Sequence, residues 1–214
     1  MKLLISLLTG TFMALAATGA QAEVIVTDKT YRDFDATFGY VSFNVTTHGR
    51  IDDLNVAVEF SKCDNPYIDP QGSRCISPDR PFENEIVMRL IGPDGRVVSL
   101  VEAETFDVGD TTGIGRIIMT FDDEGSPLGK RVQAGAFRPL GQLSVFDGMD
   151  MFGEWQLYFE DTTSSDPFEV FSSSLIFNRP ADPVADVPEP GSLAVFGAGM
   201  FALGALRRRQ RRAA

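Results

Sequence analysis

The stretch that decides the fold reads Ile86-Val87-Met88-Arg89-Leu90-Ile91, then Gly92-Pro93-Asp94-Gly95, then Arg96-Val97-Val98-Ser99-Leu100-Val101. Two short runs of aliphatic and β-branched residues flank a segment of Gly, Pro and Asp, which is the composition of a tight turn. The first run has the continuous apolar character of a short buried strand. This stretch therefore predicts a β-hairpin.

Alternation of apolar and polar residues continues the β signal on both sides of this hairpin. Two runs place an apolar side chain at every second position: Leu54, Val56, Val58 and Phe60 in one, and Trp155, Leu157 and Phe159 in the other. Further strands are predicted at 40–45, 116–121 and 174–177, whereas helical periodicity is hard to find in the body. The body is therefore predicted to be all-β, an antiparallel β-sandwich. The alternation also places Trp155 in the core rather than on a sugar-stacking surface.

Composition and charge exclude several classes of function. Of the 214 residues, 43% are apolar and 23% are charged, as in an ordinary globular protein. The formal net charge of −11 argues against nucleic acid as a partner, because nothing offsets repulsion by phosphate. One histidine and two cysteines exclude histidine-rich and four-cysteine metal sites.

The sequence shows no catalytic constellation, and we expect a protein that is not an enzyme. His48 is the only residue that could be the base of a Ser-His-Asp triad, and it lies in a predicted turn, Thr47-His48-Gly49-Arg50. The chain has no G-x-S-x-G motif. The simpler interpretation of His48 is a solvent-exposed turn residue.

The N-terminus has the pattern of a secretory signal peptide over residues 1–22. Lys2 supplies the positive start, residues 3–17 form an apolar run, and Ala20-Gln21-Ala22 is a small-residue cleavage site. We expect signal peptidase to cut before Glu23, which leaves a body at 23–179. A membrane anchor that stays attached is the alternative.

The C-terminus has three parts, and a Pro-rich linker at 180–187 precedes them. Pro188-Glu189-Pro190 comes first, and an uncharged stretch at 192–206 follows. A basic tail ends the chain with Arg207, Arg208, Arg209, Arg211 and Arg212. As a helix the uncharged stretch would be about 22 Å long, and arginine stems could extend it toward the ~30 Å of a bilayer core. The arginines should stay in the cytoplasm, which leaves the body outside.

This three-part end resembles the PEP-CTERM sorting signal, which combines a Pro-Glu-Pro motif, an apolar transmembrane helix and a basic cluster. The resemblance covers residues 188–214. It implies recognition by an exosortase, a membrane enzyme that would cut near Pro188, Glu189 and Pro190, and a link to exopolysaccharide or biofilm matrix. A plain C-terminal anchor, the alternative, would also place the body outside the cytoplasm.

A second set of motifs lies in the body, in a fixed order. Its members are Thr120-Phe121-Asp122-Asp123-Glu124, Phe137-Arg138-Pro139, the run 143–148, Gly153-Glu154-Trp155-Gln156-Leu157 and Asp161-Thr162. This order is similar to that of the P/Homo B domain, the module that follows the catalytic domain of subtilisin-like proprotein convertases. The resemblance implies a jelly-roll-like β-sandwich of about eight strands. In this chain Asn84-Glu85-Ile86 stands where the family has Gly-Asp-Leu, and only a short stretch separates the predicted signal peptide from the module.

Cys63 and Cys75 are predicted to form a disulfide. They lie 12 positions apart in a loop rich in Pro, Asp, Asn and Gly. The cysteines of an exported protein enter an oxidising compartment, where a disulfide is the simplest outcome. Closing a loop of this size stabilises a fold by about 3 kcal/mol in the chain-entropy model. Two free, partly buried thiols are the alternative.

Acidic residues at predicted strand ends are candidate calcium ligands. Asp122, Asp123 and Glu124 form a dense cluster, and Ca²⁺ takes hard oxygen ligands. The P/Homo B resemblance implies a structural calcium, for which the candidate ligands are Glu85, Asp122, Asp123 and Asp161. Solvated surface acids are the alternative.

These patterns predict an exported, non-catalytic module of the cell surface or extracellular matrix, with exosortase, signal peptidase and exopolysaccharide as its partners. Two other functions stay open at this point. One is a carbohydrate-binding module, and the other is a peptidase-associated P domain.

Overall fold

A computed structural model describes residues 21–63, 75, 80–108 and 114–180 of the chain. This part of the chain is all-β, as predicted, with ten strands and two short 3₁₀ turns, η1 (Glu83–Glu85) and η2 (Leu143–Phe146). The strands are β1 (Gln21–Asp28), β2 (Arg32–Phe34), β3 (Thr37–Val45), β4 (Asp53–Lys62), β5 (Ile86–Ile91), β6 (Val97–Val101), β7 (Ile114–Pro127), β8 (Gly135–Arg138), β9 (Gly153–Asp161) and β10 (Phe168–Pro180). The predicted number of about eight was too low, because short edge strands such as β2 carry too few residues to show a pattern.

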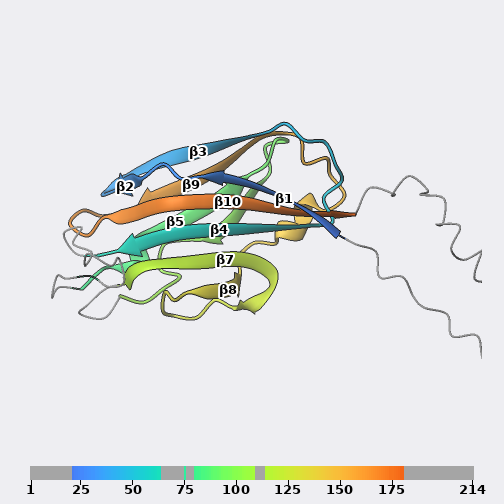
Figure 1. The fold of residues 1–214 in the computed structure, drawn as a ribbon. Coiled ribbons are helices and arrows are strands. Elements are labelled where there is room, and N and C mark those ends of the chain that lie inside the picture. The colour runs from blue at the N-terminus through green and yellow to red at the C-terminus, as the bar shows by residue number, and fades with distance from the viewer. Residues whose placement is uncertain (1–20, 64–74, 76–79, 109–113, 181–214) are drawn as a thin grey trace, which may run out of the picture. The chain divides into compact units, whose positions relative to one another are not determined.

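The strands form two sheets (Figure 1). The six-stranded sheet runs in the order β1-β10-β4-β7-β8, with β2 also paired to β10. Its pairs are antiparallel, as predicted, except for β7 and β8 at one edge, which pair in parallel. Here β7 curls so that both Phe121 and Ser126 pair with Phe137. A side chain at Gly125 would lie 2.7 Å from the backbone of Phe137, which explains the glycine at the bend.

The four-stranded sheet runs in the order β3-β9-β5-β6, and all of its pairs are antiparallel. The predicted hairpin is confirmed as β5 and β6, joined by the turn at 92–95. Gly95 donates its amide hydrogen to the carbonyl oxygen of Gly92 and has a φ of 83°, which favours glycine at this turn position. Across the sheet, Tyr40 of β3 lies directly opposite Tyr158 of β9.

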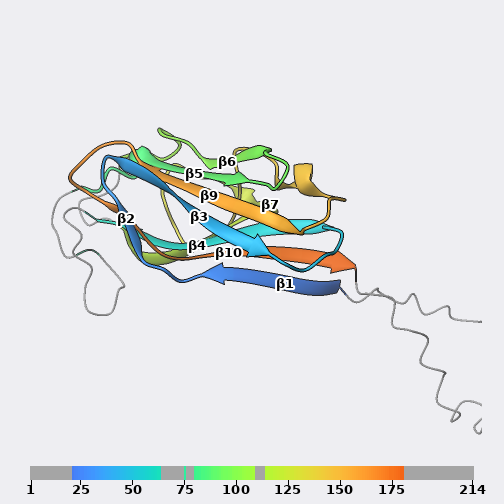
Figure 2. The same ribbon diagram turned by 90° about the horizontal axis from the view of Figure 1, so that it is seen from above.

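One hydrophobic core lies between the two sheets, which Figure 2 shows edge-on. The alternating residues Leu54, Val56, Val58 and Phe60 of β4 are at most 1% exposed. Trp155 of β9 is fully buried, as predicted, and its ring lies 5.3 Å from that of Phe177 on β10 in the other sheet. Its indole nitrogen donates a hydrogen bond to the carbonyl oxygen of Met151, so no polar group of the indole is left unpaired.

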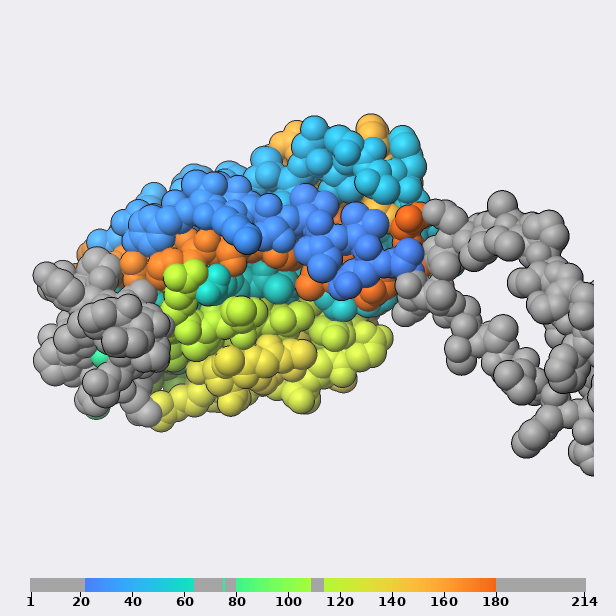
Figure 3. Space-filling model, viewed as in Figure 1, coloured from blue at the N-terminus to red at the C-terminus, as the bar shows by residue number. Residues whose placement is uncertain are grey.

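The predicted terminal segments fall almost wholly outside the described residues. Residues 21 and 22, expected at the end of the signal peptide, form the first two positions of β1 and pair with Arg179 and Pro180. Cleavage before Glu23 would leave the six pairs from Glu23 to Asp28 in place. On one face of the body, Figure 3 shows β1 and β10 on one side of β4 and β7 and β8 on the other. The described residues contain no helix that is long and apolar enough to cross a membrane, and the predicted transmembrane helix at 192–206 lies outside them.

Candidate functional site

A buried ion cluster lies at the end of β4. The ammonium nitrogen of Lys62 lies 2.6 Å from Asp161 Oδ2, 3.1 Å from Asp166 Oδ2 and 3.4 Å from Glu85 Oε2. It also donates a hydrogen bond to the backbone carbonyl of Asp166. The side chains of Lys62 and Asp161 are fully buried, and that of Asp166 is 3% exposed. We call these four residues the Lys62 cluster.

The Lys62 cluster carries more negative than positive charge. One ammonium faces three carboxyl groups, and little water reaches them. Burial, partly offset by Lys62, raises the pKa of Asp161 to about 6, and burial also raises the pKa of Glu85. The cluster therefore takes up protons more readily than ordinary surface acids do.

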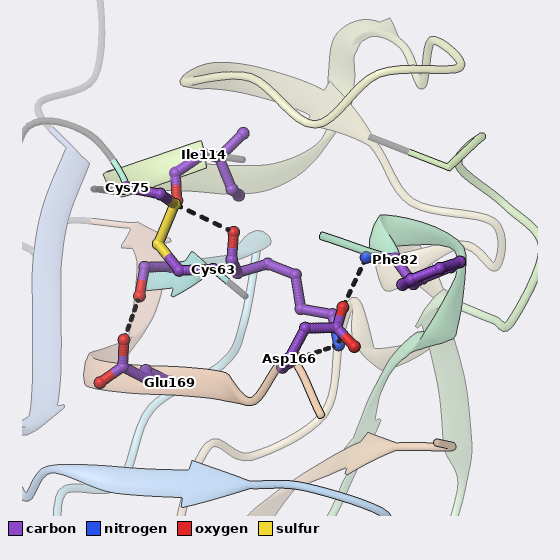
Figure 4. The surroundings of a disulfide bond; sticks show 8 residues. Cys63, Cys75, Phe82, Ile114, Asp166 and Glu169 are labelled. Atoms are coloured by element: carbon purple, nitrogen blue, oxygen red, sulfur yellow. Dashed lines mark hydrogen bonds and ion pairs between the residues drawn. A yellow bond between two sulfur atoms is a disulfide. The ribbon is translucent and has the colours of Figure 1, made fainter. Parts of the chain in front are cut away.

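The disulfide adjoins this cluster (Figure 4). Cys63 and Cys75 are bonded, with their Cα atoms 5.5 Å apart, which confirms the predicted pair. Cys75 Sγ lies 3.0 Å from the carbonyl oxygen of Ile114 at the start of β7. On the other side, the amide of Phe82 donates a hydrogen bond to Asp166 Oδ2 at 2.5 Å. The disulfide thus fixes the end of β4, next to the buried side chain of Lys62.

The four candidate calcium ligands do not form one site. Glu85 and Asp161 lie in the Lys62 cluster, where the lysine ammonium holds the central position. Asp123 instead accepts hydrogen bonds from the amides of Leu143 at 3.0 Å and Ser144 at 2.8 Å, and so caps η2. Within the described ranges, no three His, Cys, Asp or Glu residues are arranged to hold a metal ion. The residues at these strand ends thus belong to two different places in the fold.

Asp122, Asp123 and Glu124, which we call the β7 acidic cluster, lie at the protein surface. Asp122 accepts a hydrogen bond from the amide of Glu124, and a hydrogen bond between the two side chains raises the pKa of the Glu124 carboxyl. Burial and the nearby Asp53 raise the pKa of Asp147 beside this cluster. These groups repel one another across solvent.

His48 lies in an exposed loop, as predicted. Its Nδ1 is 2.7 Å from Asp150 Oδ2, and its ring stacks on that of Phe152 with 4.2 Å between centroids. The hydrogen bond to His48 lowers the pKa of Asp150 to about 2. The side chains of His48 and Asp150 are 68% and 53% exposed, so this pair sits in water rather than in a cleft.

A strip of aromatic side chains covers part of the outer face of the four-stranded sheet. Phe38 and Tyr40 of β3 are 59% and 50% exposed. The ring of Tyr158 on β9 lies 5.3 Å from that of Tyr40 and 5.7 Å from that of Phe38. The guanidinium carbon of Arg89 lies 5.3 Å from the centre of the Tyr158 ring. We call Phe38, Tyr40 and Tyr158 the aromatic strip.

Sequence reasoning missed both Lys62 and the aromatic strip, although it contained a signal for each. The alternation that buries Leu54, Val56, Val58 and Phe60 predicts an inward side chain two positions later, and that residue is Lys62. In the same way Tyr40 and Tyr158 alternate with buried neighbours. Their contact depends on the register of β3 and β9, which alternation within one strand does not determine.

Comparison with protein-family models finds a match at the C-terminus. Residues 186–210 match the model described as "PEP-CTERM protein-sorting motif". The chain carries a PEP-CTERM sorting motif. The motif includes Pro188, Glu189 and Pro190, which lie outside the described residues, as does the basic tail. The sorting motif indicates export, membrane-associated sorting before a surface or extracellular location, and processing by an exosortase-type membrane enzyme.

Other comparisons find remote similarity. No curated protein matches the chain. Among solved structures, it is similar to the Aeromonas sobria serine protease in complex with the chaperone ORF2, at 11% identity and a TM-score of 0.35, over 74% of this chain and 28% of that chain. It is also similar to FLHE, at 11% identity and a TM-score of 0.35, over 75% of this chain and 97% of that chain. The chain thus spans less than a third of the length of the first of these structures. The finding that bears on function is the match to the sorting motif.

Proposed function

We propose that this protein is a non-catalytic β-sandwich module of the cell surface or extracellular matrix, linked to exopolysaccharide or biofilm. The sorting motif at residues 186–210 is the observation that carries this proposal. Such a motif directs the body that precedes it to its location. Signal peptidase would cut before Glu23, and the exosortase would cut near Pro188, Glu189 and Pro190.

The physical chemistry of the tail supports a transient anchor. Residues 192–206 contain no charge, and the five arginines that follow resist transfer across the bilayer. Translocation would therefore stop with the body outside and the arginines inside. Cutting near Pro188, Glu189 and Pro190 would then release the body from its anchor.

The lack of a catalytic role is supported by how the candidate groups are engaged. Both oxygens of Asp123 accept amide hydrogens from η2, and Asp161 pairs with Lys62. His48 and Asp150 are widely exposed to water, which weakens their interaction with any substrate group. A general acid or base needs a substrate within hydrogen-bond reach and a pKa suited to its task. We infer that these residues do not meet both conditions.

We also propose that the body is a jelly-roll-like relative of the P/Homo B domain. The support is the order of its motifs from Thr120 to Thr162 together with its two-sheet, all-β architecture. A peptidase-associated role would require a partner protease, whereas a carbohydrate-binding role requires an exposed recognition surface. The aromatic strip supports the second of these.

Intact mass spectrometry of the protein recovered from the cell envelope and medium tests the proposed processing. The expected mass corresponds to a chain that begins at Glu23 and ends near residues 188–190. A variant with Glu189→Gln, Pro188→Ala and Pro190→Ala should keep the tail, whereas the control Glu23→Gln should be processed normally. A full-length tail on all wild-type molecules would contradict exosortase processing.

A further inference from the structure

The aromatic strip is an outward-facing platform of contacting rings. Its side chains point outward because Val41 and Leu157, the next residues along the two strands, are fully buried in the core. Tyr40 and Tyr158 are opposite each other in the register of β3 and β9, and their rings are inclined by 61°. Exposed apolar groups that gather in one place mark interaction sites, and the negative faces of aromatic rings attract polarised C–H groups such as those of a sugar ring.

A row of polar groups lies beside this platform along β9. Glu154, Gln156, Tyr158 and Glu160 occupy alternate positions of the strand and share its outer face. Ser42 and Gln156 donate hydrogen bonds to Glu154 at 3.0 and 3.2 Å, and the Tyr158 hydroxyl donates to Glu160 at 2.6 Å. These bonds orient the two carboxylates. Each carboxylate keeps acceptor capacity for a ligand, because a carboxylate has about four lone-pair positions.

The charge of this face selects the kind of ligand. Arg89 is the basic residue of the face, and Glu102 neutralises it through two hydrogen bonds at 2.8 and 2.6 Å. In the described part of the chain, Glu154 and Glu160 form no salt bridge with a basic side chain. The face therefore attracts cationic ligands and repels acidic polysaccharides. It also repels a second copy of this chain, whose net charge is −11.

The spacing of the two carboxylates favours a polymer. Glu154 and Glu160 lie six positions apart on one strand, which corresponds to about 20 Å at the usual strand rise. A single sugar cannot reach both groups, whereas a chain of several sugars laid along β9 can. Such a chain would cross the ring of Tyr158, which lies between the two carboxylates in the strand.

We propose that the aromatic strip and the polar row of β9 bind a polysaccharide whose sugar units carry free amino groups. The rings of Tyr40, Tyr158 and Phe38 stack on the sugar faces, and Glu154 and Glu160 pair with the ammonium groups. This inference rests on the proposed function, because it identifies the chemistry of the exopolysaccharide with which an exported module would be associated. Protein interfaces, by contrast, are depleted of charged residues at their centre.

Isothermal titration with two sugar hexamers tests the proposal. The protein is purified in the form that the cells release and is titrated with a β-1,4-linked glucosamine hexamer and with its fully N-acetylated counterpart. The glucosamine hexamer should bind more tightly, and its affinity should fall as salt rises. Failure of wild type to bind the glucosamine hexamer, or equal affinity for both hexamers, would overturn the proposal.

Variants separate the two parts of the site. Tyr40→Ala should weaken binding of both hexamers by about tenfold, the effect of losing one stacked ring. The combined change Glu154→Gln and Glu160→Gln should weaken only the glucosamine hexamer. Ile118→Ala removes a side chain that is 54% exposed on the other sheet and should change neither affinity. Unchanged binding by the Tyr40 variant, or a dimer in sedimentation that this variant abolishes, would overturn the proposal.

Failure of this inference is distinguishable from failure of the proposed function. A protein that loses its tail in the cell but binds neither hexamer refutes the polysaccharide site and leaves exosortase processing intact. A protein that keeps its tail but binds the glucosamine hexamer through Tyr40 refutes the processing and supports the site.

Discussion

The Lys62 cluster and the β7 acidic cluster contain the same kind of carboxyl group in different surroundings. In the first, Asp161 and Asp166 are buried and share one lysine ammonium. In the second, Asp122 is half-buried and Glu124 is exposed, and their hydrogen bond joins them to each other, whereas Asp123 accepts two amide hydrogens from the start of η2. Water screens the second set, whereas the first depends on a single cation. Acidic residues near strand ends therefore acquire their role from burial and not from their density in the sequence.

Removal of the buried cation should have the largest effect. Lys62→Met leaves three carboxyl groups without a counter-charge in the core, and breaking a buried ion pair by removing one partner costs about 3–5 kcal/mol of unfolding free energy. Urea unfolding followed by Trp155 fluorescence measures the loss. Lys29→Met, at an exposed lysine, is the matched control and should stay within about 0.5 kcal/mol of wild type. A Lys62 variant as stable as that control would show that the buried charges do not depend on the lysine.

Removal of the disulfide beside the Lys62 cluster should have the next largest effect. Cys63 and Cys75 close a loop with a sequence separation of 12. Replacing both by Ala should cost about 3 kcal/mol, because the unfolded chain regains the freedom that the bond restricts. The urea midpoint of the variant should match that of reduced wild type. A midpoint equal to that of oxidised wild type would show that the bond contributes nothing.

The pH dependence of stability should differ between wild type and Asp161→Asn. The pKa of Asp161 is raised from 3.8 to about 6 in the fold, so the folded chain binds a proton that the unfolded chain releases. Stability should therefore fall as pH rises from about 4 to about 6, by up to about 1.4 kcal/mol per pH unit, and then level off. Asp161→Asn mimics the protonated group and should lose most of this slope, although Glu85 keeps a part in the same direction. Parallel stability curves for the two proteins between pH 4 and 6 would contradict the assignment.

Two substitutions in the β7 acidic cluster should change the stability of the fold by smaller amounts and in opposite directions. Asp123→Ala removes the acceptor of two amide hydrogens from η2 and should destabilise the fold by about 1 kcal/mol. Glu124→Gln is the paired control, because it removes a repelling charge without touching η2, and should stabilise the fold slightly. Thermal melting of both variants measures the difference. Equal shifts for the two would show that Asp123 acts only through its charge.

Calcium should have the smallest effect. The melting temperature of wild type should be the same in millimolar Ca²⁺ and in chelator at matched ionic strength, because Lys62 already holds the position among Asp161, Asp166 and Glu85. Lys62→Ala should melt at a higher temperature with Ca²⁺ than with chelator, since that cavity would then offer the ion oxygen ligands. A shift of several degrees in wild type would restore calcium as a native ligand.

Features that depend on residues close together in the chain were predictable without the structure. Alternation along β4 and β9 identified strands and their buried faces, including that of Trp155, and the turn at 92–95 identified the hairpin. The predicted export of a chain with two cysteines indicated the disulfide, and the ordered tail predicted the sorting motif that the family comparison then found. Each of these signals is carried by a short piece of chain, because the two-residue period of a strand and the composition of a turn are local properties.

Contacts between residues far apart in the chain became known from the folded structure. Glu85 and Asp161 contact Lys62, whereas Asp123 contacts the start of η2. Strands β7 and β8 pair in parallel, and Tyr40 lies next to Tyr158. None of these contacts follows from the pattern of one strand, since a shift of register by one residue would turn every side chain to the opposite face. Register and sheet order are set by the packing of the whole core, and that packing joins residues more than a hundred positions apart, such as Tyr40 and Tyr158.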